Sequence, residues 1–281
     1  DVYKRQEYCT SHCFHFLFRS GAHYSYFMGW GKTEVSGHFW PCPRAQLAPL
    51  ALSTYYWQPY TRILTPRGTV TAMKLYTYDP APNPKRLQMF IDYKGIEIEK
   101  VPVDMMKQEQ LDEDYKAVNP LGTVPALVLD DGSVLTEVIG ACLYLESQFP
   151  ERPLMGAPGL EQARVVSWDH LLLMAVFQPV AEIFRNGNPA FAGRALPGPV
   201  DLEQIPELVE RGKIRLADGF RMVDDALADS PFLAGDNFSL ADIDLMIVCE
   251  FAGWAAKSEV PAECTNIHAW LPRAKEAFAQ K

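Results

Sequence analysis

Two segments place polar residues at the start of a predicted helix, where an anionic ligand can bind. The loop Tyr78–Pro84 holds Asn83 just before one helical pattern, and Glu137 stands at the start of another. The first N–H groups of a helix have no partner within it and lie in a positive potential. They suit a carboxylate or another anion. Both helix starts are therefore candidate binding positions.

The cysteines offer no evident nucleophile or metal site. Six are present, three of them before residue 73, and none forms a Cys-x-x-Cys pair. This pattern is not a disulfide framework and favours a reducing compartment, for which we expect the cytoplasm. The run Cys9–His15 holds two cysteines and two histidines. Its spacing fits no standard zinc finger, so we expect no metal.

The charge balance argues against nucleic acid and membrane as partners. The chain holds 26 Lys and Arg against 35 Asp and Glu, which gives a net charge of −9. No basic block stands out, as a nucleic-acid or anionic-membrane surface would require. No apolar run reaches the roughly 18 residues that a membrane-spanning helix needs.

Composition changes near residue 72. Residues 1–72 contain seven of the twelve tyrosines and four of the six histidines. No period of 2 or 3.6 persists among them. We predict that this segment is a non-native or disordered extension and that Met73 is the true start. A disordered native extension is the alternative.

From Met73 onward the pattern predicts a small mixed sheet with helices on its faces. Asn83 is expected to cap the first helix, Gly95 to stop it, and Asp131-Gly132 to form a hairpin turn. The expected elements are a strand at 74–78, a helix from Pro84 to Gly95, a strand at 96–103, a weak helix at 108–117, strands at 125–129 and 133–135, and a helix at 137–149.

After Pro153 the strand signals vanish. Helical patterns cover residues 160–185, 202–229, 240–255 and 266–279, and Pro179 predicts a kink in the first of them. An α/β half therefore gives way to an all-α half near residues 150–160. We expect one domain at 73–152 and a second at 160–281.

Three strings carry a resemblance to the glutathione transferase superfamily, in the family's order and spacing. They are Asn119-Pro-Leu-Gly-Thr-Val-Pro-Ala-Leu127, Leu135-Thr-Glu-Val138 and Phe232-Leu-Ala-Gly-Asp-Asn-Phe-Ser-Leu-Ala-Asp-Ile243. The last has the spacing of a capping box between Ser239 and Asp242. The resemblance implies a thioredoxin-like, glutathione-binding N-terminal domain, an all-α C-terminal domain and a homodimer.

The same resemblance implies where glutathione binds. The family has a cis proline at the position of Pro125, and the segment Thr123–Pro125 would pair with the backbone of glutathione as an added strand does. A trans proline that opens an edge strand is the alternative. Glu137 matches the acid that neutralises the ligand's amino group, although it could be merely a helix-start acid. Val138 replaces the usual Ser or Thr, which predicts binding weaker by roughly 1 kcal/mol.

The position that activates the thiol departs from the commonest pattern. Many bacterial members have Ser, Thr or Cys where Ala81 stands, and alanine cannot donate a hydrogen bond. Asn83 resembles the Asn of the Ure2-like and nu-type disulfide-reductase group, and its amide or nearby N–H groups could face the sulfur. The alternative makes Asn83 a plain N-cap. Tyr78, next to the loop, is the second catalytic candidate.

The implied function is a glutathione transferase that activates the thiol of glutathione for attack on a small electrophile. A glutathione-dependent disulfide reductase or peroxidase is one alternative, and a non-catalytic interaction or regulatory protein is another. The acceptor is expected between the domains, where Trp168, His170, Phe177 and Arg185 lie on the helix that borders this cleft in the family.

Overall fold

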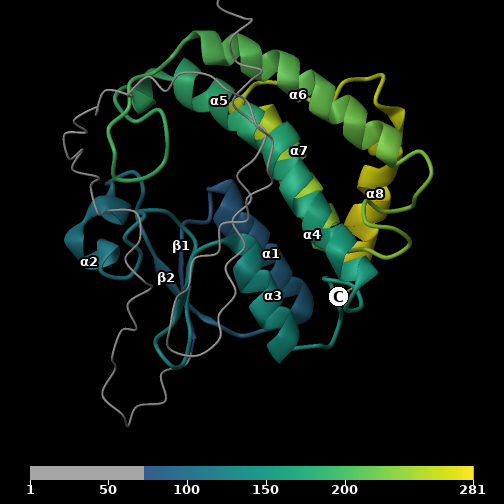
Figure 1. Ribbon diagram of the computed structural model, residues 1–281, viewed down its shortest axis with the longest axis horizontal. Helices are drawn as coiled ribbons and strands as arrows, with labels where there is room; N and C mark the ends of the chain where they lie inside the picture. The colour runs from purple at the N-terminus through teal and green to yellow at the C-terminus, as the bar shows by residue number, and fades with distance from the viewer. Residues whose placement is uncertain (1–72, 281) are drawn as a thin grey trace, which may run out of the picture. The chain divides into compact units, whose positions relative to one another are not determined.

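The computed structural model describes residues 73–280 (Figure 1). The prediction for residues 1–72, including the Cys9–His15 run, lies outside these residues. The first half of the described chain holds a four-stranded sheet in the order β2-β1-β3-β4. Its elements are β1 (Lys74–Thr77), α1 (Pro82–Lys94), β2 (Glu99–Pro102), α2 (Glu113–Lys116), β3 (Ala126–Val128), β4 (Val134–Leu135) and α3 (Val138–Gln148), with a 3₁₀ turn Glu109–Leu111 before α2.

The sheet is mixed, as the pattern predicted. β1 runs parallel to β2, with Lys74 opposite Glu99, and antiparallel to β3, with Tyr76 opposite Ala126. The β3–β4 hairpin turns at Gly132, whose φ of 83° suits glycine. The second strand is shorter than the predicted run from residue 96 to residue 103.

Helix α1 starts earlier than predicted. Its N-cap is Ala81, and Pro82 and Asn83 are its first two residues. The prediction that Asn83 is the N-cap is therefore wrong. The physical reason is that a proline lacks the N–H that would be unpaired in the first turn anyway, so both Pro82 and Pro84 fit there. The predicted end is confirmed, because Gly95 adopts a left-handed conformation with φ of 69°.

The alternation of β1 separates two clusters of side chains. Leu75 lies in the main core with residues of α1 and α3, such as Phe90 and Leu145. Tyr76 and Tyr78 point to the other face and pack against Val103, Tyr115 and Val124.

The second half of the described chain is helical. A helical run comprises α4 (Leu160–Leu172), a π-helical turn (Leu173–Phe177) and α5 (Gln178–Gly187). Then come α6 (Glu207–Ala226), α7 (Leu240–Ala255) and α8 (Thr265–Ala279). The irregularity predicted at Pro179 takes the form of this π turn, which ends two residues before the proline.

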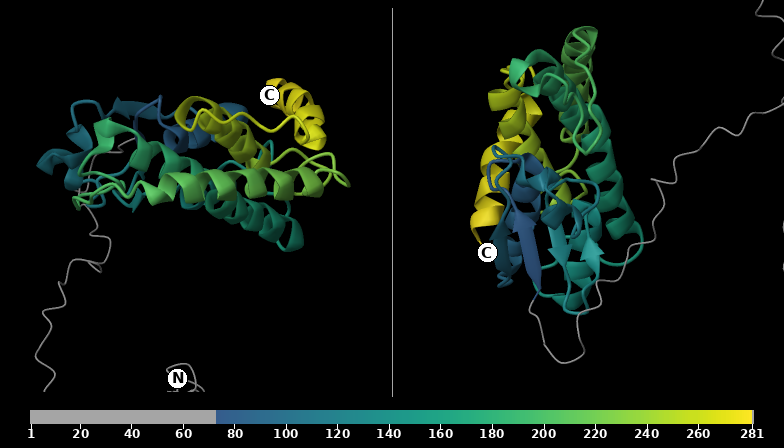
Figure 2. Two further views of the ribbon diagram at one scale, coloured as in Figure 1. Left: turned by 90° about the horizontal axis from the view of Figure 1, so that it is seen from above. Right: turned by 90° about the vertical axis from the view of Figure 1, so that its left-hand side faces the viewer.

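Helix α6 packs closely along α5 and the π turn that precedes it, and Figure 2 shows the helical half from two further sides. Two glycines of α6 make this possible. A Cβ on Gly219 would lie 2.2 Å from the Ala175 carbonyl oxygen, and one on Gly212 would lie 2.9 Å from the Pro179 carbonyl oxygen. Only glycine permits such an approach. Because Ala175 is four residues before Pro179, its carbonyl is the one that the proline ring crowds.

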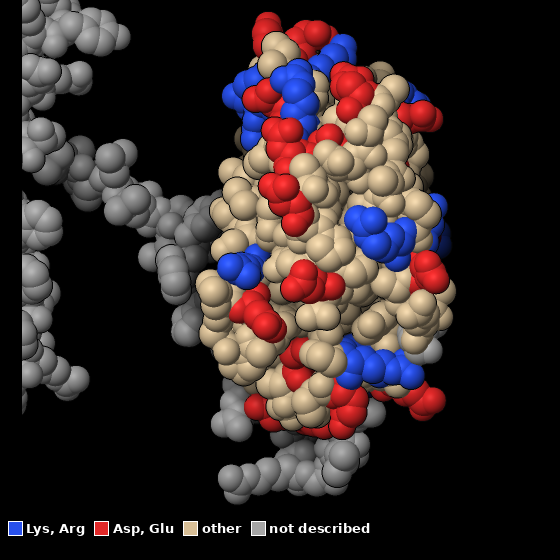
Figure 3. Space-filling view, turned by 90° about the vertical axis from the view of Figure 1, so that its right-hand side faces the viewer, with Lys and Arg blue, Asp and Glu red and all other residues tan. Residues whose placement is uncertain are grey.

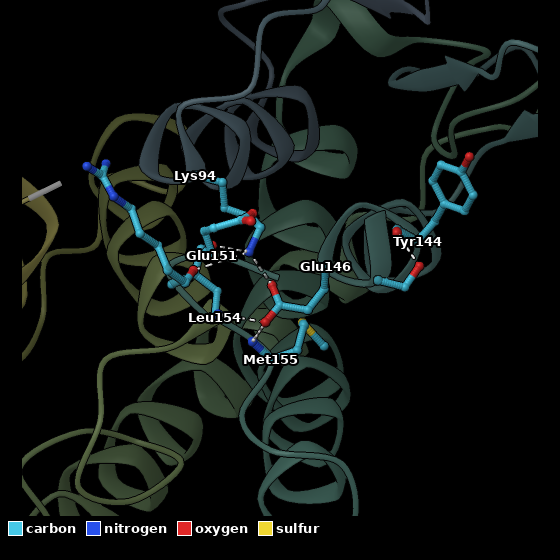
Figure 4. Close-up of polar contacts among 8 residues, drawn as sticks. Lys94, Tyr144, Glu146, Glu151, Leu154 and Met155 are labelled. Atoms are coloured by element: carbon cyan, nitrogen blue, oxygen red, sulfur yellow. Dashed lines mark hydrogen bonds and ion pairs between the residues drawn. The ribbon is translucent and has the colours of Figure 1, made fainter. Parts of the chain in front are cut away.

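We predicted the domain boundary in the segment between α3 and α4. Hydrogen bonds from Lys94 of α1 and to Glu146 of α3 hold this segment against these two helices (Figure 4). The side chain of Lys94 is 0% exposed, and its ammonium lies 2.7 Å from Glu146 and donates to the carbonyls of Glu151 and Arg152. The other oxygen of Glu146 accepts from the backbone N–H groups of Leu154 and Met155. One buried ion pair thus holds the start of the helical half.

The start of α7 has the predicted cap. Ser239 is its N-cap, and the Ser239 backbone N–H donates to the Asp242 carboxylate at 3.0 Å. The same carboxylate accepts from the backbone of Leu233 and the indole of Trp270. Asp242 therefore joins three segments of the helical half.

Charged side chains of both signs are interspersed on the face shown in Figure 3. No basic patch gathers on this face. Among residues 73–280, no helix is both long and apolar enough to cross a membrane.

Candidate active site

The catalytic prediction depends on Asn83, in the first turn of α1, and on Tyr78, in the loop after β1. A turn closes this loop, because the Ala81 N–H donates to the Tyr78 carbonyl at 2.9 Å. Ala81 presents only a methyl group. Asn83 follows two residues later in the first turn of α1. It is thus the first side chain after Ala81 with a donor.

Asn83 is held by Arg86, which lies one turn further along α1. The Arg86 Nη1 donates to the Asn83 Oδ1 at 3.0 Å. A guanidinium has only donors, so the amide oxygen must be the atom that faces it. The Asn83 Nδ2, with its two N–H groups, is the part of the amide that Arg86 leaves unused. An N–H of defined direction can stabilise a thiolate.

Arg86 is in turn held by the helical half. It is 7% exposed, and its Nε lies 2.7 Å from Asp244 on α7, while its Nη2 lies 2.5 Å from Asp169 on α4. We call Asn83, Arg86, Asp169 and Asp244 the Arg86 cluster. Its carboxylates come from positions 83 and 158 residues away from Arg86. The direction of the Asn83 amide is therefore set by contact between the two halves of the chain.

Burial governs the electrostatics of this cluster. The Asp244 Oδ2 is buried and has no hydrogen-bond partner among the described residues. Burial raises the pKa of Asp244 to about 7, although Arg86 opposes the shift. Cys142 lies close enough to feel these charges, and burial keeps its pKa well above the usual value. Cys142 is therefore a protonated thiol and no nucleophile.

The segment that ends in Pro125 is positioned by its own neighbours. The Val124–Pro125 peptide bond is cis, as it is in the family that the sequence resembles. The Thr123 carbonyl accepts from the Tyr115 hydroxyl at 2.5 Å and from the Asn119 amide at 2.7 Å. The Thr123 hydroxyl also accepts from the Asn119 amide. Thr123 is thus engaged internally, whereas the backbone N–H and carbonyl of Val124 form no hydrogen bond within residues 73–280.

Glu137 and Val138 stand at the start of α3. Glu137 is the N-cap and makes no capping bond through its side chain. Partial burial raises the pKa of its carboxylate, Arg86 opposes this rise, and Asp169 adds to it. Glu137 therefore lies within the electrostatic reach of the Arg86 cluster. The side chain of Val138 is buried in the core, and it is the first helical residue, so its N–H is one of the unpaired donors of the helix start.

The structure groups these residues into two sets. The first set is Asn83, which Arg86 contacts, and Glu137, on which the charge of Arg86 acts. Tyr78 belongs to the second, because its side chain packs with Val124 on the sheet face away from α1. The catalytic prediction for Tyr78 is therefore not supported by a contact between Tyr78 and Asn83. Of the residues expected to border the acceptor, His170 is exposed, Trp168 packs against the core, and Phe177 packs on Phe251.

Arg86, Asp169 and Asp244 were not singled out by the sequence reasoning. One signal was present. Asp244 lies inside the apolar run Leu240–Phe251, and Arg86 lies beside Leu87 in the apolar pattern of α1. Charges on a buried face need a partner, because an unpaired buried charge is costly. The pattern indicates that partners exist but not which ones.

The cysteines in the part of the chain that the structure describes are poor nucleophiles. All three have raised pKa values, mainly through burial, and Cys249 reaches about 12. No group of side chains within this part of the chain has the composition of a metal site, judged by His, Cys, Asp and Glu.

Comparison with known proteins agrees with the resemblance. Residues 81–148 match the N-terminal domain of glutathione S-transferase, and residues 206–273 match its C-terminal domain. The chain is 30% identical to glutathione S-transferase GstA of Escherichia coli O157:H7 over 183 residues, which cover 64% of this chain and 82% of that one. It is 29% identical to glutathione S-transferase 2 of Saccharomyces cerevisiae over 214 residues, 74% of this chain and 89% of that one.

A solved structure supports the same assignment. The glutathione S-transferase domain-containing protein of Marinobacter aquaeolei has a TM-score of 0.64 and 30% identity, covering 71% of this chain and 96% of that one. The thioredoxin-like sheet with its helices, followed by an all-helical half, is thus the fold of these proteins. The chain belongs to the glutathione S-transferase family.

Proposed function

We propose that this protein binds glutathione, lowers the pKa of its thiol, and directs the thiolate at an electrophilic carbon. The observation that carries the proposal is the contact between Arg86 and Asn83. It holds the amide oxygen and leaves the amide N–H groups for the sulfur. A donor aimed at sulfur favours the thiolate, which is the nucleophile. Ala81 cannot supply this donor.

The remaining candidate residues bind the peptide part of glutathione in this proposal. The Val124 backbone pairs with the cysteinyl residue of glutathione as a short strand does. The N–H of Val138 and the positive start of α3 hold the ligand's α-carboxylate. Glu137 accepts from the α-amino group. Thr123 acts through its place beside Val124, since its own oxygens accept from Asn119 and Tyr115.

The test is an Asn83→Ala variant, with Asp92→Asn on the exposed side of α1 as the matched control. The pKa of bound glutathione is read from the ultraviolet absorbance of its thiolate during a pH titration. We expect Asn83→Ala to raise this pKa by about one unit and to lower kcat with little change in glutathione affinity. If the Asn83→Ala variant has the same thiol pKa and the same kcat as the wild type, Asn83 does not activate the thiol.

The choice between conjugation and disulfide chemistry needs a panel of substrates. We propose conjugation to an electrophile as the main reaction, and the same thiolate can also attack a disulfide sulfur. The assay compares an aryl halide with a mixed disulfide of glutathione at equal concentrations. Turnover of the disulfide alone would replace the transferase proposal by the reductase one. No turnover of either, with no glutathione binding, would favour an interaction protein.

We further propose that the protein is a cytoplasmic homodimer. Large apolar side chains are exposed on α4, its π turn and α6: Leu160 is 68% exposed, Met174 44% and Ile214 73%. Such side chains are common at interfaces between subunits. Light scattering should give twice the chain mass. An Ile214→Glu variant should dissociate at a higher protein concentration than the wild type does. A wild type that is monomeric at all concentrations would contradict the proposal.

A further inference from the structure

A row of aromatic side chains crosses from α7 to the loop after α5. Phe177 packs on Phe251 with ring centroids 5.1 Å apart, and Phe251 packs on Trp254 at 5.3 Å. Trp254 meets Phe184 edge-on at 5.2 Å, and Phe184 meets Phe191 at 4.9 Å. We call these five residues the aromatic row. Phe251 is buried, and the other four rings are at least partly exposed, so a flat, apolar ligand can contact them by stacking and edge contacts.

One end of the aromatic row reaches the loop that leads to Asn83. Phe251 and Trp254 border a hollow of about 220 Å³ together with Asp79, Pro80 and Pro82. The side chain of Trp254 is 43% exposed, so this end is accessible. The row therefore begins beside the loop that would hold the sulfur of glutathione.

The other end reaches the segment before Pro125. After Phe191 the chain continues through residues 192–205, and this segment runs from α5 toward α2 (Figure 1). A Cβ on Gly198 would lie 3.5 Å from the Leu121 carbonyl oxygen, which is an ordinary contact distance. Leu121 is two residues before Thr123. The aromatic row thus lies beside the Asn83 loop at Phe251 and Trp254, and the segment after Phe191 approaches the cis-proline segment at Leu121.

Two guanidinium groups lie on the far end of the row. Arg185 lies over the Phe191 ring at 4.5 Å from its centroid, and Arg194 lies at 5.9 Å. Arg185 donates to the carbonyls of Arg194 and Ala195, and Arg194 donates to the carbonyl of Ala190. These acceptors are neutral. Within the described part of the chain, neither guanidinium has an ion pair with Asp or Glu.

This arrangement brings two like charges together with only neutral acceptors bonded to them. Burial, together with the nearby charge of Arg194, lowers the pKa of Arg185 to about 10. Each guanidinium is attracted to the ring, but the two cations repel each other, and an anion between them would relieve this repulsion. A guanidinium also presents its N–H groups in a fork that matches a carboxylate.

We infer that the acceptor substrate is an aromatic electrophile that carries a carboxylate or phenolate, bound by Arg185 and Arg194. The inference rests on the proposed function, since it names the class of its second substrate. The aryl ring lies along the aromatic row, with its anionic group at the arginines and its reactive carbon toward the Asn83 loop. The thiolate of glutathione attacks the carbon that bears a halide. The C–S bond forms, the C–halogen bond breaks, and halide leaves with the electron pair.

The test measures binding, so that it does not depend on turnover. Two S-aryl glutathiones are titrated by calorimetry: S-(4-carboxy-2-nitrophenyl)glutathione and the methyl ester of its aryl carboxylate. We expect Arg194→Gln to weaken binding of the acid by about tenfold and binding of the ester by twofold or less. Arg194→Lys should recover part of the loss. Arg221→Gln, on the exposed surface of α6, is the matched control and should change neither.

The outcomes separate the inference from the proposed function. Equal effects of Arg194→Gln and Arg185→Gln on the acid and the ester, or no effect on the acid, would overturn the role of the arginines. So would a wild type that binds neither conjugate. In a further outcome, the wild type binds the acid more tightly than the ester, Arg194→Gln removes this preference, and 4-chloro-3-nitrobenzoate is not turned over. That outcome would support the anion site and contradict the proposed transferase reaction.

Discussion

The two sides of the candidate site are positioned in different ways. The segment Thr123–Pro125 is held by Asn119 and Tyr115, which lie within ten residues of it in the sequence. Asn83 is held by Arg86, whose other partners, Asp169 and Asp244, belong to the helical half. Backbone pairing at Thr123–Pro125 thus depends on local structure, and thiol activation on contact between the halves. Disruption of the contact between the halves should therefore affect the thiol and leave the Thr123–Pro125 segment intact.

The largest effect is expected from Arg86→Leu. This variant leaves Asp169 and Asp244 buried without their counter-charge, which costs about 3–5 kcal/mol of unfolding free energy. Urea denaturation measures the loss. The control is Lys213→Ala, which breaks an exposed pair with Glu210 and should cost under about 1 kcal/mol. Equal stability of Arg86→Leu and the wild type would mean that the halves are not joined through Arg86.

The next effect is a pH dependence from the same cluster. The pKa of Asp244 is raised from 3.8 to about 7 in the folded state. The folded state then binds this proton more tightly than the unfolded state. Its contribution to stability is full below about pH 4 and is lost as the pH rises through about 7. Three titratable or charged residues face the Asp244 carboxylate: Arg86, Asp169 and Cys142. All three are present in both the wild type and the Asp244→Asn variant.

Asp244→Asn isolates this titration, because the amide keeps the shape and cannot ionise. The unfolding free energy of the wild type minus that of the variant should decrease between about pH 4 and pH 7. Chemical denaturation at a series of pH values gives both curves. A difference that is flat, or that increases with pH, would show that Asp244 is ionised throughout this range.

Asn119→Ala should act on the other side of the comparison. The buried Asn119 amide holds both the carbonyl and the hydroxyl of Thr123. Its removal should raise KM for glutathione by about tenfold, an effect of 1–3 kcal/mol, while the pKa of bound thiol stays at the wild-type value. Steady-state kinetics and thiolate titration measure the two quantities. A shift of the thiol pKa in this variant would break the separation between the two sides.

The smallest effect is expected from Val138→Thr. The new hydroxyl stands at the start of α3 and can donate to the carboxylate of glutathione. One neutral hydrogen bond is worth about 1 kcal/mol, less the cost of placing a polar atom where Val138 is buried. Calorimetry should show tighter glutathione binding with an unchanged thiol pKa. Weaker binding would mean that this position faces only the core.

Much of the fold could be predicted because its signals are local. Gly95 ends α1, Gly132 turns the hairpin, and Ser239 with Asp242 begins α7, all as the residues indicated. The misplaced start of α1 has a local cause as well. Two prolines, Pro82 and Pro84, both fit a first helical turn, and the sequence does not say which one begins the helix.

The sequence by itself determined the family, the order of the elements and the candidate positions Asn83, Val124, Pro125 and Glu137. These depend on short strings and on periodicity within single elements. Only the tertiary structure decided that Arg86 turns the Asn83 amide and that Arg185 and Arg194 share one aromatic ring. The physical reason is that a buried charge needs a partner, and that the partner can lie more than 80 residues away, as Asp169 does from Arg86. Only the folded chain shows which residue is the partner.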